Sequence, residues 1–422
     1  MIESSPAGLV TAAPTTAPER IAVVDMLRGL AIFGILTVNM EGFSSPGYRA
    51  EDGERLWTGL VDRVVETLIS HAAVGKFMIV FTVLFGLGFA LQMQRVAARE
   101  VSFSRIQVRR LLVLLLIGLA HAHLIWWGDI LVSYALAGLL LLLFRGGRPR
   151  TILIWAIALN LLSFAGLEIN VARDLARPAA VPSGESSTPG AVVLRPGSAS
   201  QTALHAYGRG SFAEIARQRV GDFWSQNREL YEVVVRRLSF FLFGLFVGQL
   251  GILRNVAAHR GLLLRTLKWA LVVGVAAHVA RFLLFLPGAA QWLRLLRLPT
   301  SIVGNPAMAA VYCIGAILLF QVPGWRARLE PLATVGRAAL SNYLLQSLIC
   351  TSIFYSYGLG LYGQVGPAAG LGLTVLIFAL QVPLSVWWLR RFRFGPAEWL
   401  WRSLTYRRLQ PLRITGERVT TD

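Results

Sequence analysis

Long apolar runs dominate the pattern of hydrophobic and polar positions along this chain. Ten of them approach the roughly twenty residues that a helix needs to cross a bilayer. They lie at 22–41, 73–93, 108–127, 129–145, 151–169, 231–253, 262–287, 300–321, 335–357 and 367–390. The pattern therefore predicts an all-α, polytopic membrane protein with about ten transmembrane helices.

Polar residues interrupt the first of these runs. At 3.6 residues per turn, Asp25 and Arg28 lie one turn apart, and Asn39 returns to the same side about 21 Å further along. An ionisable group at the centre of a bilayer costs roughly 2.5 kcal/mol or more, so it normally faces protein or a water-filled cavity. Two interpretations fit: an Asp25–Arg28 ion pair that orients the helix near the membrane surface, or one wall of a polar chamber. We favour the chamber.

The segments between the runs predict surface helices and a linker. Residues 54–70 place Leu56, Leu60, Val64 and Leu68 on one side, which is typical of a helix lying on the membrane. Residues 171–205 are rich in Pro, Ala, Ser and Gly and indicate a flexible extracytoplasmic linker, and a second surface helix is expected at 208–229. The predicted organisation is a disordered N-terminus (1–20), a first transmembrane half (21–170), an extracytoplasmic linker and surface helix (171–229), a second transmembrane half (230–393) and a cytoplasmic tail (394–422).

Charge placement predicts the orientation. Every alternate connection is basic, and Lys and Arg collect in cytoplasmic loops, so both termini are expected in the cytoplasm. The connection 170–230 also holds arginines, but it is long enough for this rule to lose force. The same placement accounts for the net charge of +19. No basic and aromatic module of the kind that binds RNA or DNA is present, so a nucleic-acid partner is not expected.

Composition supports a membrane location. The chain has 422 residues, 55% hydrophobic and only 15% charged, where a soluble protein holds about 25% charged residues. Cys313 and Cys350 both fall inside apolar runs, so they are interpreted as core residues without a disulfide or metal role. Residues 1–19 lack a basic region before an apolar core, so the first run is expected to serve as an uncleaved anchor.

A histidine and an aspartate near the outer end of the third run are the candidate catalytic pair. His121 lies within reach of Asp129 across a short turn. A carboxylate beside an imidazole fixes its tautomer and raises its basicity, as a general base requires. Alternatively, Asp129 only interacts with the dipole at a helix N-terminus and His121 satisfies it. His123 cannot share a helix face with His121, so the two do not predict a metal site.

Further polar groups complete two predicted sets. Lys76 either belongs to a polar site or extends to the interface, and Asn342 and Gln346 either face the chamber or bond a neighbouring helix. The inner set comprises Asp25, Arg28, Arg337 and Asn342. The outer set comprises Asn39, His71, Lys76, His121, Asp129, His278 and Arg281. A chain with both sets is expected to accept something from each side of the membrane.

Several stretches carry a family resemblance. They are VDMLRGLAIFGILTVN (24–39), GKFMIVFTVLFGLGFAL (75–91), GLAHAHLIWWGDILVSYALAGL (118–139), VGRAALSNYLLQSLICTSIFYSYGLGLYG (335–363) and FGPAEWLWRSLTY (394–406). They resemble the YeiB-like family of bacterial multi-pass membrane proteins, whose shared domain has no agreed function. The resemblance implies a location in the bacterial cytoplasmic (inner) membrane.

The opening D-x-x-R-G helix, with Asp25, Arg28 and Gly29, also resembles membrane acetyltransferases such as heparan-α-glucosaminide N-acetyltransferase. In those enzymes cytosolic acetyl-CoA donates an acetyl group to a sugar on the far side, with a loop histidine as catalyst. Residues 42–56 contain no histidine where those enzymes carry theirs. His71 or His121 would therefore take that role here.

These expectations combine into a transmembrane acyltransferase that moves an acyl group from cytosolic acyl-CoA to an extracytoplasmic small molecule or envelope glycan. Arg28 and Arg337 would bind the anionic donor, because guanidinium suits phosphate recognition. His121, oriented by Asp129, would deprotonate the acceptor, and Asn39 could donate to the oxyanion. The other expected substrate-binding residues are Asp25, Lys76, Asn342 and Gln346, and no metal is expected.

The alternative functions are a transporter or flippase for a small polar or lipid-linked solute, and a structural scaffold. A homo-oligomer is compatible with the sequence.

Overall fold

The computed structural model describes residues 21–46, 56–97, 103–176, 198–283 and 297–414, and this part of the chain is helical, with one isolated antiparallel bridge between Phe392 and Arg413. The α-helices are α1 (Ala22–Ser44), α2 (Leu60–Ala72), α3 (Lys76–Ala97), α4 (Phe103–Leu124), α5 (Leu131–Leu141), α6 (Pro149–Ala176), α7 (Ala199–Arg209), α8 (Phe212–Gln226), α9 (Leu230–Leu250), α10 (Arg260–Leu283), α11 (Arg297–Phe320), α12 (Pro323–Arg337), α13 (Ala339–Phe354), α14 (Pro367–Arg391) and α15 (Pro396–Tyr406). Two short 3-10 turns follow α5 (Leu142–Phe144) and α9 (Ile252–Arg254).

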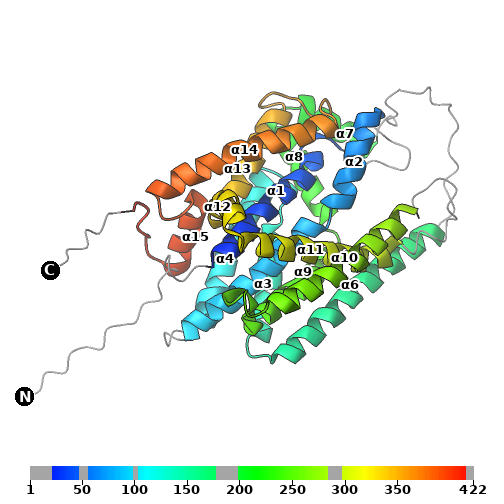
Figure 1. The fold of residues 1–422 in the computed structure, drawn as a ribbon. Coiled ribbons are helices and arrows are strands. Elements are labelled where there is room, and N and C mark those ends of the chain that lie inside the picture. The colour runs from blue at the N-terminus through cyan, green and yellow to red at the C-terminus, as the bar shows by residue number, and fades with distance from the viewer. Residues whose placement is uncertain (1–20, 47–55, 98–102, 177–197, 284–296, 415–422) are drawn as a thin grey trace, which may run out of the picture.

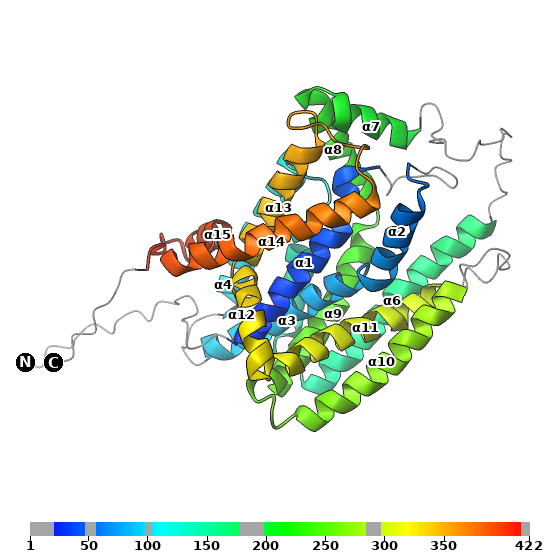
Figure 2. The ribbon, with the colours of Figure 1, turned by 45° about the horizontal axis from the view of Figure 1, so that its top comes forward.

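Helix α1 forms the centre of the molecule (Figure 1). It packs against α3, α12, α13 and α14. Apart from a few polar residues, α1 is apolar on all sides, so it is expected to be covered by other helices, and most of it is buried. Figure 2 shows α6, α9, α10 and α11 on one side of α1, and α12 to α15 on the other.

The prediction of a helical protein with membrane-spanning segments is confirmed. In the described part of the chain, six helical segments are long and apolar enough to cross a membrane: Ala22–Ser44, Leu60–Arg95, Leu230–Leu250, Arg260–Leu283, Thr300–Phe320 and Pro367–Arg391. Shorter apolar helices occupy Leu131–Phe144, Pro149–Ser163 and Ala339–Phe354. A helix therefore stands at each expected run, while the count of ten spans and the cytoplasmic termini stay predictions.

The ninth run departs from its predicted span. Where one helix was expected over 335–357, the chain ends α12 at Arg337 and starts α13 at Ala339. The reason is a tertiary cap, because the Glu398 carboxylate of α15 accepts the backbone N–H groups of Leu340 (2.7 Å) and Ser341 (3.2 Å). Such a cap satisfies donors that the first turn of a helix leaves unpaired. Arg337 consequently closes α12 instead of opening a transmembrane helix.

The predicted surface helices are present with different bounds. Helix α2 starts at Leu60 and leaves Leu60, Val64 and Leu68 exposed, as expected of an apolar face meant for lipid. The second surface helix, expected over 208–229, is α8. The expected linker (171–205) departs from its prediction at both ends, because residues 171–176 belong to α6 and residues 199–205 belong to α7, which packs on α8. The N-terminal segment before residue 21, most of the linker (177–197) and the end of the tail (415–422) lie outside the described residues.

The two predicted transmembrane halves contact each other closely. The pairs α1–α12, α3–α9 and α6–α9 each join a helix of the first half to one of the second. Glycines permit this at α3–α9, since a Cβ on Gly86 would lie 2.0 Å from the Phe241 carbonyl oxygen and one on Gly244 would lie 2.0 Å from that of Val83. Small residues allow this close approach of membrane helices.

Candidate functional site

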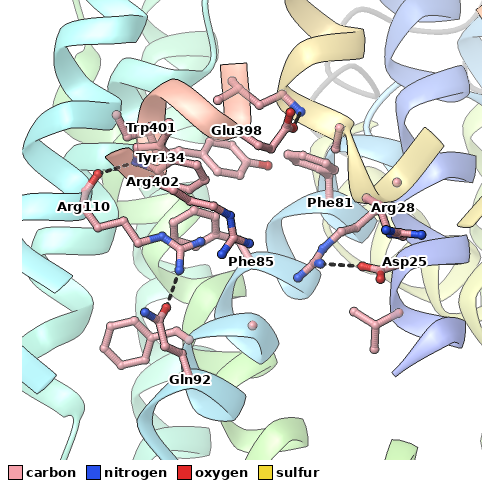
Figure 3. Close-up of a pocket in the computed structure, with 18 of the residues that line it drawn as sticks. Asp25, Arg28, Phe81, Phe85, Gln92, Arg110, Tyr134, Glu398, Trp401 and Arg402 are labelled. Carbon is pink, nitrogen blue, oxygen red and sulfur yellow. Dashed lines mark hydrogen bonds and ion pairs between the residues drawn. The ribbon is translucent and has the colours of Figure 1, made fainter. Parts of the chain in front are cut away.

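A cavity of about 260 Å³ lies between the first turns of α1, the C-terminal half of α3, the first half of α4 and the amphipathic helix α15. Figure 3 shows Asp25 and Arg28 on one side of it and Arg110, Trp401 and Arg402 on the other. Its wall is formed by the start of α1, the ends of α3 and α12, and α15. These segments therefore share one end of the helix bundle, which is the end expected in the cytoplasm.

Positive charge predominates around this cavity. Five arginines line it, against two carboxylates, Asp25 and Glu398: the arginines are Arg28, Arg95, Arg110, Arg337 and Arg402. Asp25 neutralises one of them, because Arg28 Nη1 donates to its carboxylate at 2.8 Å. The surplus of guanidinium groups makes the cavity suited to an anion, and phosphates are the anions that guanidinium binds best.

Helix α15 holds one wall of the cavity in place. Its Trp401 indole donates to the Arg110 carbonyl at 2.8 Å, and the Arg110 guanidinium lies 4.3 Å from the Trp401 ring centre. Glu398 fixes the same helix to α13 through its capping contacts. Burial raises the pKa of Glu398 above its ordinary value, and the hydrogen bonds from Ser341 act against that rise. Burial and, to a smaller extent, the neighbouring Arg28 lower the pKa of Arg402, while Tyr406, Glu398 and Asp25 act against that fall.

Deeper inside, the cavity becomes apolar and aromatic. Phe81, Phe85, Phe89 and Tyr134 line this part together with aliphatic residues of α1, α4 and α5. The Phe85 ring stacks on Phe241 of α9 at 4.5 Å, which holds it against the protein core. The cavity thus combines a cationic entrance with an apolar interior, a match for an amphipathic anion.

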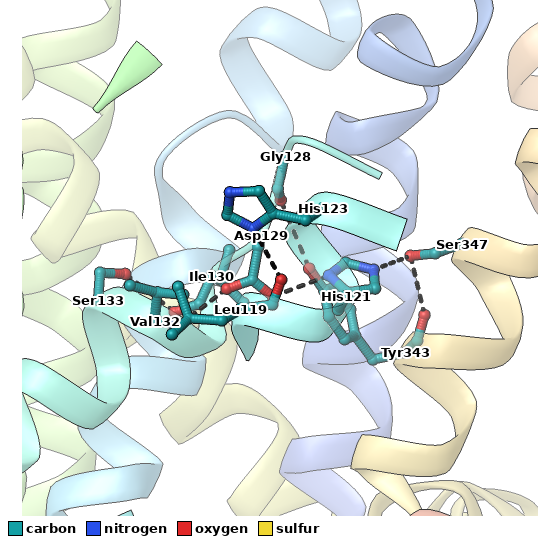
Figure 4. Close-up of polar contacts among 10 residues, drawn as sticks. All are labelled: Leu119, His121, His123, Gly128, Asp129, Ile130, Val132, Ser133, Tyr343 and Ser347. Carbon is teal, nitrogen blue, oxygen red and sulfur yellow. Dashed lines mark hydrogen bonds and ion pairs between the residues drawn. The ribbon is translucent and has the colours of Figure 1, made fainter. Parts of the chain in front are cut away.

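The predicted catalytic pair is in contact. His121 Nδ1 lies 2.8 Å from Asp129 Oδ2, and its Nε2 lies 2.9 Å from the Ser347 hydroxyl of α13 (Figure 4). The other carboxylate oxygen of Asp129 accepts the backbone N–H of Val132 at 2.7 Å, at the start of α5. Asp129 therefore contacts the imidazole and also caps a helix, a geometry compatible with either sequence interpretation. The role of His121 as a base stays a prediction.

Tyr343 lies between the cavity and the three contacting residues Asp129, His121 and Ser347. It lines the cavity wall, and its ring centre lies 5.1 Å from that of His121. Its hydroxyl donates to the Gly128 carbonyl, one residue before Asp129, at 3.4 Å. A single aromatic side chain therefore separates the arginine-lined cavity from His121.

Four predicted substrate-binding residues do not line this cavity: Asn39, Lys76, Asn342 and Gln346. Asn39 is half-buried further along α1. Asn342 and Gln346 instead join α13 to α14: Asn342 Nδ2 donates to Ser385 Oγ at 3.1 Å, and Gln346 Nε2 donates to Gln381 Oε1 at 2.8 Å. This is the alternative role of interhelical hydrogen bonding, which suits amides inside a membrane.

The remaining members of the predicted outer set gather elsewhere, between α2, α3, α10 and α11. The His71 and His278 ring centres lie 6.4 Å apart, and Lys76 is almost fully buried with its Nζ donating to the Ser70 carbonyl at 3.4 Å. Arg281 donates to Ser301. The outer set thus divides into a His121 cluster and a His71 cluster. Among the described residues, no group of three or more His, Cys, Asp or Glu side chains could hold a metal ion.

Sequence reasoning missed Ser347, Tyr343, Arg110, Arg402 and Glu398. Ser347 is 226 positions from His121, so no local spacing could reveal the contact. Helix α15 was assigned to a separate tail, although its run FGPAEWLWRSLTY shows amphipathic spacing that could have indicated a helix covering a site.

Comparison with known proteins identifies the family. A family model described as "Protein of unknown function (DUF418)" matches residues 247–408. The chain is 38% identical over 416 residues to the protein YxaH of Bacillus subtilis (strain 168), covering 94% of this chain and 97% of that protein. It is 29% identical over 411 residues to YeiB of Escherichia coli (strain K12), covering 93% and 98%. The expected family resemblance is thereby confirmed: the chain belongs to the YeiB-like family, whose shared domain has no assigned function.

Proposed function

We propose that this protein is a membrane acyltransferase that takes an acyl group from acyl-CoA on the cytoplasmic side. The observation that carries the proposal is the cavity with a cationic entrance, an apolar interior and an inner wall, Tyr343, that contacts His121. An acyl-CoA thioester likewise has a charged part and an apolar part, with phosphates at one end and an acyl group at the other. The chemistry of each part of the cavity therefore matches one part of the donor.

Cavity size sets how the donor would enter. Pockets that enclose a drug-sized ligand measure about 300–1,000 Å³, and this cavity holds about 260 Å³. The acyl-bearing arm would therefore enter, while the nucleotide would remain at the mouth near Arg28, Arg110 and Arg402. In that pose the thioester would approach Tyr343 and the His121 cluster.

The acceptor would reach the protein from the opposite end of α1. A second cavity of about 380 Å³ lies there and is lined by Glu41, Glu66, Trp57 and Ser200 among others. Its carboxylates give it the opposite charge to the donor cavity, which favours hydroxyl- or amine-bearing acceptors over anions. An amine or glycan hydroxyl of the cell envelope fits this description.

Binding of acetyl-CoA by the full-length protein in nanodiscs tests the proposal. Arg110→Gln removes a cavity guanidinium, whereas the control Arg105→Gln alters an exposed arginine on the same helix. Because a hydrogen bond to a charged group contributes about 1.5–3 kcal/mol, we expect Arg110→Gln to weaken binding about 10- to 100-fold and Arg105→Gln to leave it unchanged. Failure of the wild-type protein to bind acetyl-CoA or octanoyl-CoA would contradict the proposal.

Transfer itself is measured with radiolabelled acetyl-CoA and envelope extract in proteoliposomes. We expect label to appear on an extract component, and His121→Ala to reduce this transfer about 10²- to 10⁴-fold, the usual contribution of general base catalysis. Movement of an unmodified solute across the same membranes, without transfer of label, would favour the transporter alternative.

A further inference from the structure

Both ring nitrogens of His121 are engaged. Nδ1 faces the Asp129 carboxylate at 2.8 Å, and Nε2 faces the Ser347 hydroxyl at 2.9 Å. His121 and Ser347 are each at most 1% exposed, and the Asp129 side chain is 0% exposed. An acceptor molecule therefore cannot reach a free nitrogen of His121 in this arrangement. In this resting arrangement, the first proton that His121 takes up must come from Ser347.

The tautomer follows from the partners. An ionised carboxylate can only accept, so the proton of a neutral His121 is on Nδ1 and points at Asp129. Nε2 then carries the lone pair and accepts the Ser347 O–H. The Ser347 hydroxyl also lies 3.3 Å from the Tyr343 carbonyl, but the contact with Nε2 is the shorter one. Ser347 is thus placed to lose its proton to His121.

Serine, histidine and aspartate in this order form the arrangement that activates a serine nucleophile, whatever the fold that holds it. We propose that Ser347 is the catalytic nucleophile and carries the acyl group as an ester, an inference that rests on the proposed acyltransferase function. In this mechanism His121 does not act directly on the acceptor before Ser347 is acylated. Asp129 holds the His121 ring and stabilises its protonated form.

The donor would reach Ser347 past Tyr343. The two residues lie four positions apart on α13, on one face of the helix and about one turn, or roughly 6 Å, apart. Tyr343 forms part of the cavity wall, so the cavity ends one helical turn before the Ser347 hydroxyl. A rotation of the Tyr343 side chain would bring a thioester carbonyl to Ser347.

The two half-reactions balance. Ser347 Oγ forms a bond to the thioester carbonyl carbon while its proton passes to His121 Nε2, and the C–S bond then breaks as the sulfur takes that proton. In the second half, the acceptor hydroxyl or amine attacks the serine ester and gives its proton to His121. His121 returns this proton to Ser347 Oγ as the ester C–O bond breaks, which restores the resting triad.

Covalent labelling tests the proposal. Full-length protein in nanodiscs is incubated with [14C]acetyl-CoA without acceptor, quenched in acid and mapped by peptide mass spectrometry. We expect an acetyl group on Ser347 in the wild type, background labelling in Ser347→Ala, and a hydroxylamine-sensitive thioester in Ser347→Cys. Ser133→Ala is the control, because Ser133 is also buried, on α5, but donates to the carbonyl of Ile130, just before that helix. It should label like the wild type.

The outcomes separate this inference from the proposed function. Suppose that the wild-type protein binds acetyl-CoA and transfers label, and that Ser347→Ala retains this transfer. That result would overturn the role of Ser347 and leave the acyltransferase proposal standing. Wild-type protein that binds acetyl-CoA but takes up no label, or takes it up on another residue, would also overturn the inference. Absence of both binding and transfer would instead remove the proposed function on which it rests.

Discussion

Gly29 and Gly336 let the backbones of α1 and α12 touch beside the candidate donor cavity. A Cβ on Gly336 would lie 1.8 Å from the Asp25 carbonyl oxygen, and one on Gly29 would lie 2.1 Å from that of Leu332. Real Cβ atoms do not approach backbone so closely, so a larger residue must push the two helices apart. The neighbours of this contact, Asp25 and Arg337, both line the cavity.

Replacement of Gly336 by alanine therefore tests the importance of this approach. We expect Gly336→Ala to lower stability by about 1–3 kcal/mol, the usual cost of overpacking, and to weaken acetyl-CoA binding because it displaces cavity residues. Thermal unfolding in detergent measures the first effect. Gly324→Ala on the same helix is the control, because its Cβ would meet nothing within 4 Å. Equal unfolding temperatures for the two variants would show that α1 and α12 do not need this contact.

At the residue scale, sequence reasoning succeeded where polar groups interrupt an apolar run. Asp25 and Arg28 stood out for the energetic cost of charge in hydrocarbon, and both line the cavity. Asn342 and Gln346 stood out for the same reason, but their side chains bond α14 instead. A polar residue in a membrane helix requires a partner, but spacing along one helix does not tell whether that partner is a ligand or another helix.

At the element scale, apolar runs located the helices well, while their ends depended on tertiary contacts. The break between α12 and α13 is stabilised by Glu398, 58 positions after Leu340, so local pattern could not show it. The end of α4 is a second such case. Arg219 of α8 donates to the carbonyl oxygens of His123 at 2.8 Å and Ile125 at 3.2 Å, and it is only 1% exposed.

Because Arg219 holds the end of α4, it also supports the segment from His121 to Asp129. We expect Arg219→Lys to lose one of the two charged hydrogen bonds, to lower stability by about 2 kcal/mol, and to reduce acyl transfer by misplacing Asp129. Unfolding temperature and transfer rate are measured on the same preparations. The exposed Arg217→Lys on α8 should match the wild type in both. An Arg219→Lys variant that does the same would mean that the surface helix does not organise the triad.

At the scale of the whole molecule, the basic and acidic cavities lie on different parts of α1. The first contains Asp25 and Arg28, near its start, and the second contains Glu41 and Ser44, near its end. The sequence predicted two polar sets spread over several helices, with members of both on this helix. His71, Lys76, His121 and Asp129 were expected in one outer set, because sequence alone does not define which helices are neighbours. In the structure, His71 and Lys76 lie among α2, α3, α10 and α11. His121 and Asp129 lie among α4, α5 and α13.

The proposed direction of transfer requires the basic cavity to face the cytoplasm, which cysteine accessibility can test. Both substitutions are made in a variant without Cys313 and Cys350. Ala258→Cys places an exposed thiol between α9 and α10. Leu359→Cys places one between α13 and α14, at a side chain that is 70% exposed. Arginines flank the first connection, as the positive-inside rule requires of a cytoplasmic loop. We therefore expect a membrane-impermeant maleimide to label Leu359→Cys in intact cells, and Ala258→Cys only after the membrane is opened. The reverse pattern would place the arginine-lined cavity on the outer face, where cytosolic acyl-CoA could not reach it.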